Sequence, residues 1–323
     1  MIDQEILYLM VLVSVIIPLY NKKNYIGRTI QSVLDQTISD FEIIVIDDGS
    51  LDGSSDVVKS FHDNRIQLFW QKNQGVSAAR NNGVRRASAD FIAFLDADDE
   101  WLPNHLGTLL KLRNTYPDAG AFTTAYRILE ASEKIRPARY RAIPAYPWEG
   151  LIPNYFKSAA LGDSPMNSSS IGIPKIVFNE FGGFPEGVWW GEDTDLFGKI
   201  ALKYPIAFSW EIGAVYHWNA SNRACTRPSV NIEPFVITGL EALQKCDISP
   251  EIRYYLEEYI SRKELYRAIC ILLQNDRESA VRILKNIKTR IFFFQKCMLF
   301  LLSFIPQKTR NNIIEWLLYP THE

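Results

Sequence analysis

The first hundred residues alternate short apolar runs with stretches whose apolar positions recur at helical spacing. The run "VLVSVIIP" (residues 11–18) is continuous and β-branched, as expected of a strand buried on both faces. In the next segment, Ile26, Ile30, Val33 and Leu34 share one helical face. Further strands are predicted at "FEIIVIDDGS", "RIQLFW" and "FIAFLDAD", and further helices at "SSDVVKSFH" and "GVSAARNNGVRRA". Strands separated by crossover helices predict an α/β fold with a mostly parallel, Rossmann-like sheet.

The rest of the chain divides into an irregular middle and a helical end. Residues 121–220 are rich in Gly, Pro and aromatic side chains, with strand-like pieces at "GAFTTAYRIL", "SSSIGI", "IAFSW" and "AVYHW". A helix is predicted over residues 192–202, with Leu196 and Ile200 facing inward. Beyond about Asn231 the pattern is helical. We therefore expect an α/β domain over residues 1–225 and a helical C-terminal region over residues 226–323.

Composition and charge narrow the class of protein. The 323 residues are 47% hydrophobic and 22% charged, as in an ordinary globular protein. The net charge of -2 gives no general attraction to nucleic acid, so we expect no nucleic-acid partner. The four cysteines form no CxxC pair in a chain of this length, which favours a reducing, cytoplasmic location; they are Cys225, Cys246, Cys270 and Cys297.

No apolar run reaches the roughly 18 residues expected of a membrane-spanning helix. The run from Ile6 to Leu19 is shorter, and Asp3 and Glu5 precede it where a signal peptide would carry positive charge. We interpret its second half as a buried strand and Met10 as a candidate start of the chain.

Acidic residues follow two of the predicted strands. "IDDGS" contains Asp47 and Asp48, and "FLDADDEW" contains Asp96, Asp98 and Asp99. Because ligands bind beyond the carboxyl ends of the strands in such sheets, we expect these side chains on one rim. The pair Asp96-x-Asp98 can direct two carboxylates at one Mg²⁺ or Mn²⁺ ion, since both ions prefer oxygen ligands. An acidic turn that opens the next helix is the alternative, and it needs no metal.

Three other segments carry candidate chemistry. Arg80 follows Gly75 at a predicted helix start, and both an arginine and a helix N-terminus favour anionic groups. Glu192 and Asp193 follow an aromatic loop, where a partly desolvated carboxylate can act as a general base. His217 follows a predicted strand and could ligate a metal or a phosphate. Each also has a structural interpretation, as a surface charge, as N-capping acids and as a structural histidine.

Six ordered segments resemble the family 2 glycosyltransferases of the GT-A fold. They span roughly residues 11–220 and are "VSVIIPLYN", "IGRTIQSVLDQT", "FEIIVIDDGSLDGS", "NQGVSAARNNGV", "FIAFLDADDEWLP" and "EFGGFPEG....GEDTDLFGKI". The resemblance implies an inverting, metal-dependent transferase of the hexosyltransferase type. Its donor would be a nucleotide-diphospho-sugar, with a UDP-sugar favoured. Its acceptor would be a saccharide or a lipid-linked hydroxyl in the synthesis of cell-surface polysaccharide.

The resemblance also implies roles for residues at matching positions on the nucleotide side. Pro18, Tyr20 and Asn21 would line the nucleotide pocket, with Tyr20 in contact with the base. Asp48, in preference to Asp47, would accept a hydrogen bond from the base. Arg80 would lie near the base or the diphosphate.

The remaining roles concern the metal and the reaction. Asp96 would lie near the ribose, and Asp98 would bind a Mn²⁺ or Mg²⁺ ion that bridges the diphosphate, with His217 as an additional metal or diphosphate ligand. Asp193 would be the general base, and Glu192 would position the acceptor. Asp99, and also Arg223 and Arg227 beyond the last matching segment, are weaker candidates. Lys199 stands where relatives often have an arginine.

Other functions and the role of the tail stay open. A sugar-phosphate nucleotidyltransferase usually has a Gly-rich loop after its first strand, where this chain has "PLYNKKNYIG". A non-catalytic nucleotide or glycan binder would not need both Asp98 and Asp193. The tail segment "RIFFFQKCMLFLLSFIPQ" mixes apolar and basic residues. It either packs on the protein or on a partner subunit, or it attaches the chain peripherally to the inner face of the membrane.

Overall fold

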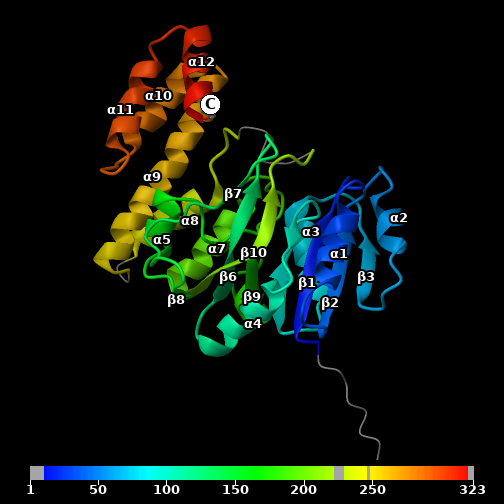
Figure 1. The fold of residues 1–323 in the computed structure, drawn as a ribbon. Helices are drawn as coiled ribbons and strands as arrows, with labels where there is room; N and C mark the ends of the chain where they lie inside the picture. Colours follow the sequence, from blue (N-terminus) through cyan, green and yellow to red (C-terminus); the bar gives the residue numbers. More distant parts are fainter. Residues whose placement is uncertain (1–10, 222–228, 246–247, 319–323) are drawn as a thin grey trace, which may run out of the picture.

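The computed structural model describes residues 11–221, 229–245 and 248–318, so Met10, Arg223, Arg227, Cys225 and Cys246 lie outside the described residues. Its centre is a mixed sheet in the strand order β3-β2-β1-β4-β9-β6-β10-β5 (Figure 1). Two short strands lie off this path, β7 (Ile135–Pro137) beside β6 and β8 (Glu149–Leu151) beside β10. The strands of the path are β1 (Val13–Leu19), β2 (Phe41–Asp47), β3 (Ile66–Trp70), β4 (Phe91–Phe94), β5 (Glu100–Trp101), β6 (Ala121–Leu129), β9 (Ile171–Pro174) and β10 (Ile206–His217).

The N-terminal half is the predicted parallel sheet with its crossover helices. Strands β3, β2, β1 and β4 are parallel, and every residue of β1 and β2 is buried. The crossovers are α1 (Ile26–Leu34), α2 (Ser54–Lys59) and α3 (Val76–Arg86). These elements confirm the predicted α/β class, because only a sheet covered on both faces buries continuous β-branched runs in this way.

The middle of the chain extends the sheet with strands of both directions. β9 is antiparallel to β4 and β6, whereas β10 is parallel to β6. The expectation of two separate strands at "IAFSW" and "AVYHW" was wrong, since both belong to β10, which shifts register between Ser209 and Ala214. Gly213 is there for packing, because a Cβ at this position would lie 2.1 Å from Nδ1 of His105 on α4 (His105–Thr115).

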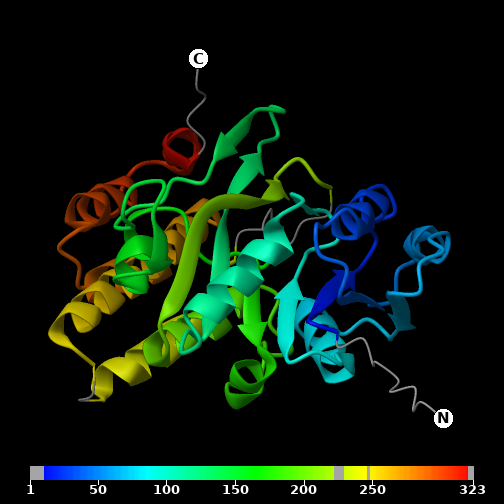
Figure 2. The ribbon, with the colours of Figure 1, turned by 60° about the horizontal axis from the view of Figure 1, so that its bottom comes forward.

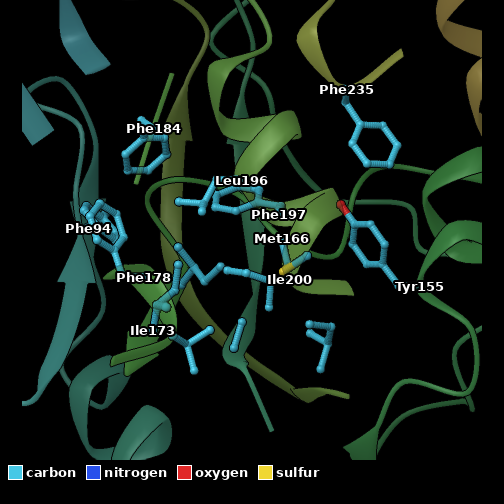
Figure 3. Packing of buried hydrophobic residues seen from close by; sticks show 14 of the residues in the cluster. Phe94, Tyr155, Met166, Ile173, Phe178, Phe184, Leu196, Phe197, Ile200 and Phe235 are labelled. Carbon is cyan, nitrogen blue, oxygen red and sulfur yellow. The ribbon is translucent and has the colours of Figure 1, made fainter. Parts of the chain in front are cut away.

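Helices α5 (Tyr155–Leu161), α6 (Lys175–Glu180) and α7 (Glu192–Lys203) cover the second half of the sheet. Leu196 and Ile200 of α7 are fully buried, as predicted from their spacing. Figure 3 shows these α7 side chains between a group of phenylalanines that includes Phe94 and Phe184, whose ring centroids lie 5.2 Å apart, and Phe235 beyond. The core therefore holds the start of α7 in a defined position against the sheet.

The C-terminal region is helical, as predicted, and its two ends pack differently. It consists of α8 (Pro234–Gln244), α9 (Pro250–Leu273), α10 (Arg277–Asn286), α11 (Phe293–Leu302) and α12 (Gln307–Leu318). Helix α8 and the first half of α9 share the core of the sheet, whereas the side chains from Leu265 onward form a separate hydrophobic cluster. Figures 1 and 2 show α10 to α12 at the end of the molecule opposite α1 to α3. The predicted domain division at 225/226 falls within residues 222–228, outside the described residues.

A buried carboxylate separates α10 from α11. Glu258 on α9 accepts hydrogen bonds from the backbone N–H groups of Arg290 and Ile291 and from the hydroxyl of Thr289. These bonds satisfy backbone donors that a continuous helix would use internally. Within the described parts of the chain, no helix is both long and apolar enough to span a bilayer.

Candidate active site

A cavity of about 690 Å³ opens at the carboxyl ends of β1, β2 and β4, facing the N-terminus of α7. Its volume is typical of a pocket for a small-molecule ligand. Asn21 and His217 are the two predicted site residues that do not line it. Asn21 lies beside it, with Oδ1 accepting a hydrogen bond from the backbone N–H of Leu51 at 2.9 Å. The predicted residues that line the cavity are Pro18, Tyr20, Asp48, Arg80, Asp96, Asp98, Glu192 and Asp193.

The two acids that follow β2 have different surroundings. Asp48 lines the cavity, and its carboxylate accepts hydrogen bonds from the backbone N–H groups of Gln74 and Gly75, at 2.9 and 2.8 Å. Asp47 is not part of the lining and instead caps the following turn, accepting from the backbone N–H of Ser50 at 2.8 Å. Of the two, only Asp48 is placed to contact a ligand in the cavity.

The acidic turn after β4 is balanced by two cationic side chains of the protein. Asp98 Oδ2 lies 2.7 Å from Nζ of Lys22, and Asp96 Oδ1 lies 2.6 Å from the guanidinium of Arg80. Lys22 also donates to the backbone carbonyl of Ser221 at 2.7 Å. The repulsion that the sequence suggests for these neighbouring acids is therefore offset inside the chain.

The next two acids of the turn belong to the structural framework. Asp99 is fully buried, and accepts hydrogen bonds from the hydroxyl of Ser169 and the backbone N–H of His217. Burial, and then the charges of the neighbouring aspartates, raise the pKa of Asp99 well above its ordinary value. Glu100 Oε1 lies 2.9 Å from Nε2 of His217. The structure thus places His217 on Asp99 and Glu100 rather than in the cavity wall.

Arg80 connects the two ends of the cavity. Its guanidinium is 3% exposed, and lies 2.6 Å from Asp96 and 3.0 Å from Glu192. Burial alone would lower the pKa of Arg80, but the two carboxylates raise it above its ordinary value. A permanently charged side chain therefore joins the end of β4 to the start of α7, which are far apart in the sequence.

The turn before α7 presents two adjacent carboxylates. Gly191 has φ +77°, a left-handed conformation that favours glycine, and a Cβ there would lie 3.1 Å from Cγ of Glu233. Asp193 Oδ1 accepts a hydrogen bond from the backbone N–H of Thr194 at 2.6 Å, which orients its carboxylate in the cavity lining. Glu192 is more buried, and that burial, followed by the charge of Asp193, raises its pKa to about 7.

The raised pKa of Glu192 predicts a pH-dependent stability. Its folded-state pKa of about 7 exceeds its ordinary value of 4.5, so this group's contribution is fully present below pH 4.5 and is lost as pH rises towards 7. We expect the free energy of unfolding of Glu192→Gln to fall less than that of the wild type over this interval, by about 1–3 kcal/mol. Urea titrations at several pH values measure the difference. Equal slopes for the two proteins would contradict it, and Glu278→Gln, at a residue with an exposed side chain, is the control.

The donor set fits a divalent ion shared with a ligand. Among the described residues, no three His, Cys, Asp or Glu side chains gather into a complete metal site. Mn²⁺ and Mg²⁺ are commonly held by one or two carboxylates together with phosphate oxygens, and Asp98 supplies such oxygens in the cavity wall. Lys22 already brings a positive charge to this carboxylate, which shows that Asp98 is oriented to hold a cation.

Three further residues line the cavity that the sequence did not suggest, namely Lys22, Glu233 and Lys263. Lys263 Nζ lies 3.0 Å from Oε2 of Glu233, which also accepts a hydrogen bond from the indole of Trp190 through Oε1. Both residues belong to the predicted helical region, where Lys263 looks like one of many surface charges on a long helix. The C-terminal helices therefore build part of the cavity wall next to Asp193.

The tryptophans and Lys199 have structural surroundings. Trp190 stacks on Tyr266 of α9 with ring centroids 6.1 Å apart, whereas Trp189 is 42% exposed at the cavity. Lys199 pairs with Asp195 one turn earlier on α7, at 2.6 Å. Trp218 lies near the guanidinium of Arg136, 5.5 Å from its ring centroid to the Arg136 Cζ. Of these aromatic rings, Trp189 is the one available to a ligand in the cavity.

Comparisons with known proteins agree with this geometry. The family model described as Glycosyl transferase family 2 matches residues 14–168. An uncharacterized glycosyltransferase of Rickettsia bellii is 49% identical over 193 residues, which is 59% of this chain and 26% of that relative. The putative teichuronic acid biosynthesis glycosyltransferase TuaG of Bacillus subtilis is 40% identical over 35% of this chain and 46% of its own length. The chain thus spans less than half the length of both relatives.

Solved structures show the same fold at low sequence identity. The S. aureus TarS fragment 1-349 in complex with UDP-GlcNAc has a TM-score of 0.65 and 16% identity, covering 96% of this chain and 93% of that one. The mannosyltransferase PcManGT from Pyrobaculum calidifontis, in complex with GDP-Man and Mn²⁺, has a TM-score of 0.60 and 17% identity, covering 96% and 88%. The chain therefore belongs to the family 2 glycosyltransferases and has their GT-A fold.

Proposed function

We propose that this chain transfers a sugar from a nucleotide-diphospho-sugar to an acceptor hydroxyl with inversion at the anomeric carbon. The observation that carries the proposal is that one cavity gathers both halves of the required chemistry. Asp48, Asp96 and Asp98 lie at the strand ends, and Asp193 lies at the start of α7.

The strand-end half of the cavity would hold the nucleotide. Tyr20 is 47% exposed and would offer its ring to the base, beside Pro18 and with Asn21 holding the loop behind it. Asp48 would accept a hydrogen bond from the base, and Asp96 would lie at the ribose. The solved complexes with UDP-GlcNAc and GDP-Man support a nucleotide-sugar donor, and we favour a UDP-sugar.

The metal half of the proposal rests on Asp98. A Mn²⁺ or Mg²⁺ ion held there with the diphosphate would neutralise the charge that develops on the leaving nucleoside diphosphate. Lys22 would have to leave Asp98 or share it, and its ammonium could then turn to a phosphate oxygen. His217 would support the site indirectly, since its backbone N–H holds Asp99.

Asp193 would act as the general base. Its carboxylate would remove the proton of the acceptor hydroxyl as that oxygen attacks the anomeric carbon, and the bond from that carbon to the phosphate oxygen would break. Attack from the opposite face inverts the configuration in one displacement. Glu192, held by Arg80, would position the acceptor beside Asp193, and Trp189 offers an apolar surface to a sugar ring.

We further propose a role in cell-surface polysaccharide synthesis, in the cytoplasm. The similarity to the putative teichuronic acid biosynthesis enzyme supports this setting. Cys270 and Cys297 are free thiols, as expected of a protein from a reducing compartment. The acceptor would be a saccharide or a lipid-linked hydroxyl.

Calorimetric titration with UDP, GDP and dTDP, each with and without Mn²⁺, tests the donor site. We expect one nucleotide to bind and its affinity to rise at least about tenfold with the metal, because the ion links the diphosphate to Asp98. Asp98→Asn should lose this metal-dependent gain and keep the metal-free affinity. Asp118→Asn, on a loop away from the cavity, is the matched control.

Two outcomes would contradict the proposal. Failure of all three nucleotides to bind, with or without Mn²⁺, would point to a non-catalytic relative or to a different donor. An unchanged Mn²⁺ effect in Asp98→Asn would place the metal elsewhere.

A further inference from the structure

We propose that α10 and α11 form a docking surface for an anionic lipid bilayer. We call this surface the α10–α11 face and define it by the exposed or groove-lining residues Lys285, Lys288, Phe293, Phe294, Lys296, Leu301 and Phe304. It lies at the far end of the C-terminal helices from α1 to α3 (Figure 1). None of its residues lines the donor cavity, so the inference does not depend on the proposed reaction.

The apolar part of this face is unusually open. Phe293, Phe294, Leu301 and Phe304 are 62, 76, 68 and 55% exposed. Phe294 and Leu301 are seven residues apart, two helical turns, so they lie along one side of α11. A soluble protein rarely leaves several large apolar side chains exposed together unless the surface binds a partner or a membrane.

Charge around the face is of one sign. Residues 279–314 contain no Asp or Glu, although the whole chain has a formal net charge of -2. The same stretch contains seven basic residues, which are Arg282, Lys285, Lys288, Arg290, Lys296, Lys308 and Arg310. A local excess of positive charge beside exposed aromatic side chains matches an anionic headgroup layer above acyl chains.

The positive charges lie directly at the edge of the apolar surface. A groove of about 440 Å³ between α10 and α11 is lined by Lys285 and Lys296 together with Cys297, Phe300 and Leu301, and by Leu284 at its base. Such a groove can take a lipid phosphate at its lysines while the neighbouring apolar side chains enter the hydrocarbon boundary.

The same charge pattern disfavours a second copy of this chain as the occupant. A two-fold symmetric dimer would bring one α10–α11 face against another, with lysines opposite lysines. Like charges facing each other across an interface are unfavourable, whereas anionic lipid supplies the opposite charge. We therefore assign the face to a bilayer.

Vesicle co-sedimentation of the full chain tests this assignment. We expect it to bind phosphatidylcholine vesicles that contain about 30% phosphatidylglycerol, and to bind pure phosphatidylcholine about tenfold or more weakly. Phe293→Ser/Phe294→Ser and Lys285→Gln/Lys288→Gln should each weaken partitioning to the anionic vesicles about tenfold. All four side chains are exposed, so both variants should keep the wild-type thermal unfolding midpoint.

Matched controls remove the same chemistry elsewhere. Ile176→Ser deletes a 78% exposed apolar side chain on α6, and Lys59→Gln/Lys134→Gln removes two exposed lysines distant in sequence. Both should bind within about twofold of the wild type. The proposal is overturned if the wild type does not sediment with anionic vesicles, or if the controls lose binding equally. It is also overturned if light scattering shows a dimer that the double serine variant converts to a monomer.

Discussion

Asp193→Asn is expected to lower the rate of sugar transfer by about 10²- to 10⁴-fold while leaving nucleotide binding nearly intact. Asn keeps the shape of the side chain, and its amide oxygen can still accept the hydrogen bond from Thr194. It cannot accept the proton of the acceptor hydroxyl, so only the chemical step should suffer. Release of nucleoside diphosphate from the sugar nucleotide that binds, with water or a saccharide as acceptor, measures the rate.

The control for this variant is Asp56→Asn, which neutralises an acid in the first turn of α2, away from the cavity. It should turn over at the wild-type rate. Normal turnover by Asp193→Asn would show that another group is the base. Loss of nucleotide binding would instead show that Asp193 holds the donor, and the two failures are separated by calorimetry.

Arg80→Met is expected to lower the free energy of unfolding by about 3 kcal/mol. The substitution leaves the carboxylates of Asp96 and Glu192 without the buried cation that both contact. A buried charge that has lost its partner is costly, and the cost should shrink at acidic pH because the carboxylates can then take up protons. Urea denaturation at pH 5 and pH 8 measures both the size and the pH dependence of the loss.

Arg85→Met on the same helix is the matched control, since Arg85 is exposed, and it should change stability by less than about 0.5 kcal/mol. Adding Glu192→Gln to Arg80→Met should recover part of the loss, because one of the two unpaired charges is removed. Wild-type stability in Arg80→Met would show that the two ion pairs contribute nothing to folding.

The elements with the clearest hydrophobic periodicity were predictable because their local sequence and their final environment agree. The run in β1 is apolar at every position because both faces of that strand are covered. The division of β10 into two strands failed because Gly213 looks like a turn in sequence. It is a glycine because His105, more than a hundred residues earlier, packs against its backbone.

The candidate site shows the same limit. Asp48, Asp96 and Asp98 were found because strand ends of a parallel sheet meet at one edge, a rule that applies to sequence order. The wall formed by Glu233 and Lys263 was missed, since no pattern links a charge on a long helix to a sheet far before it. His217 was expected at the metal and lies on Asp99 and Glu100, outside the lining of the cavity.

The sequence by itself determined the order of strands and helices, the parallel core and the edge on which the acids lie, because these follow from local periodicity and chain direction. Only the tertiary structure decided which charges meet. Lys22 on Asp98, Arg80 between its two carboxylates and Lys263 on Glu233 are contacts between distant segments. Their energies depend on burial and distance, and neither quantity exists until the chain has folded.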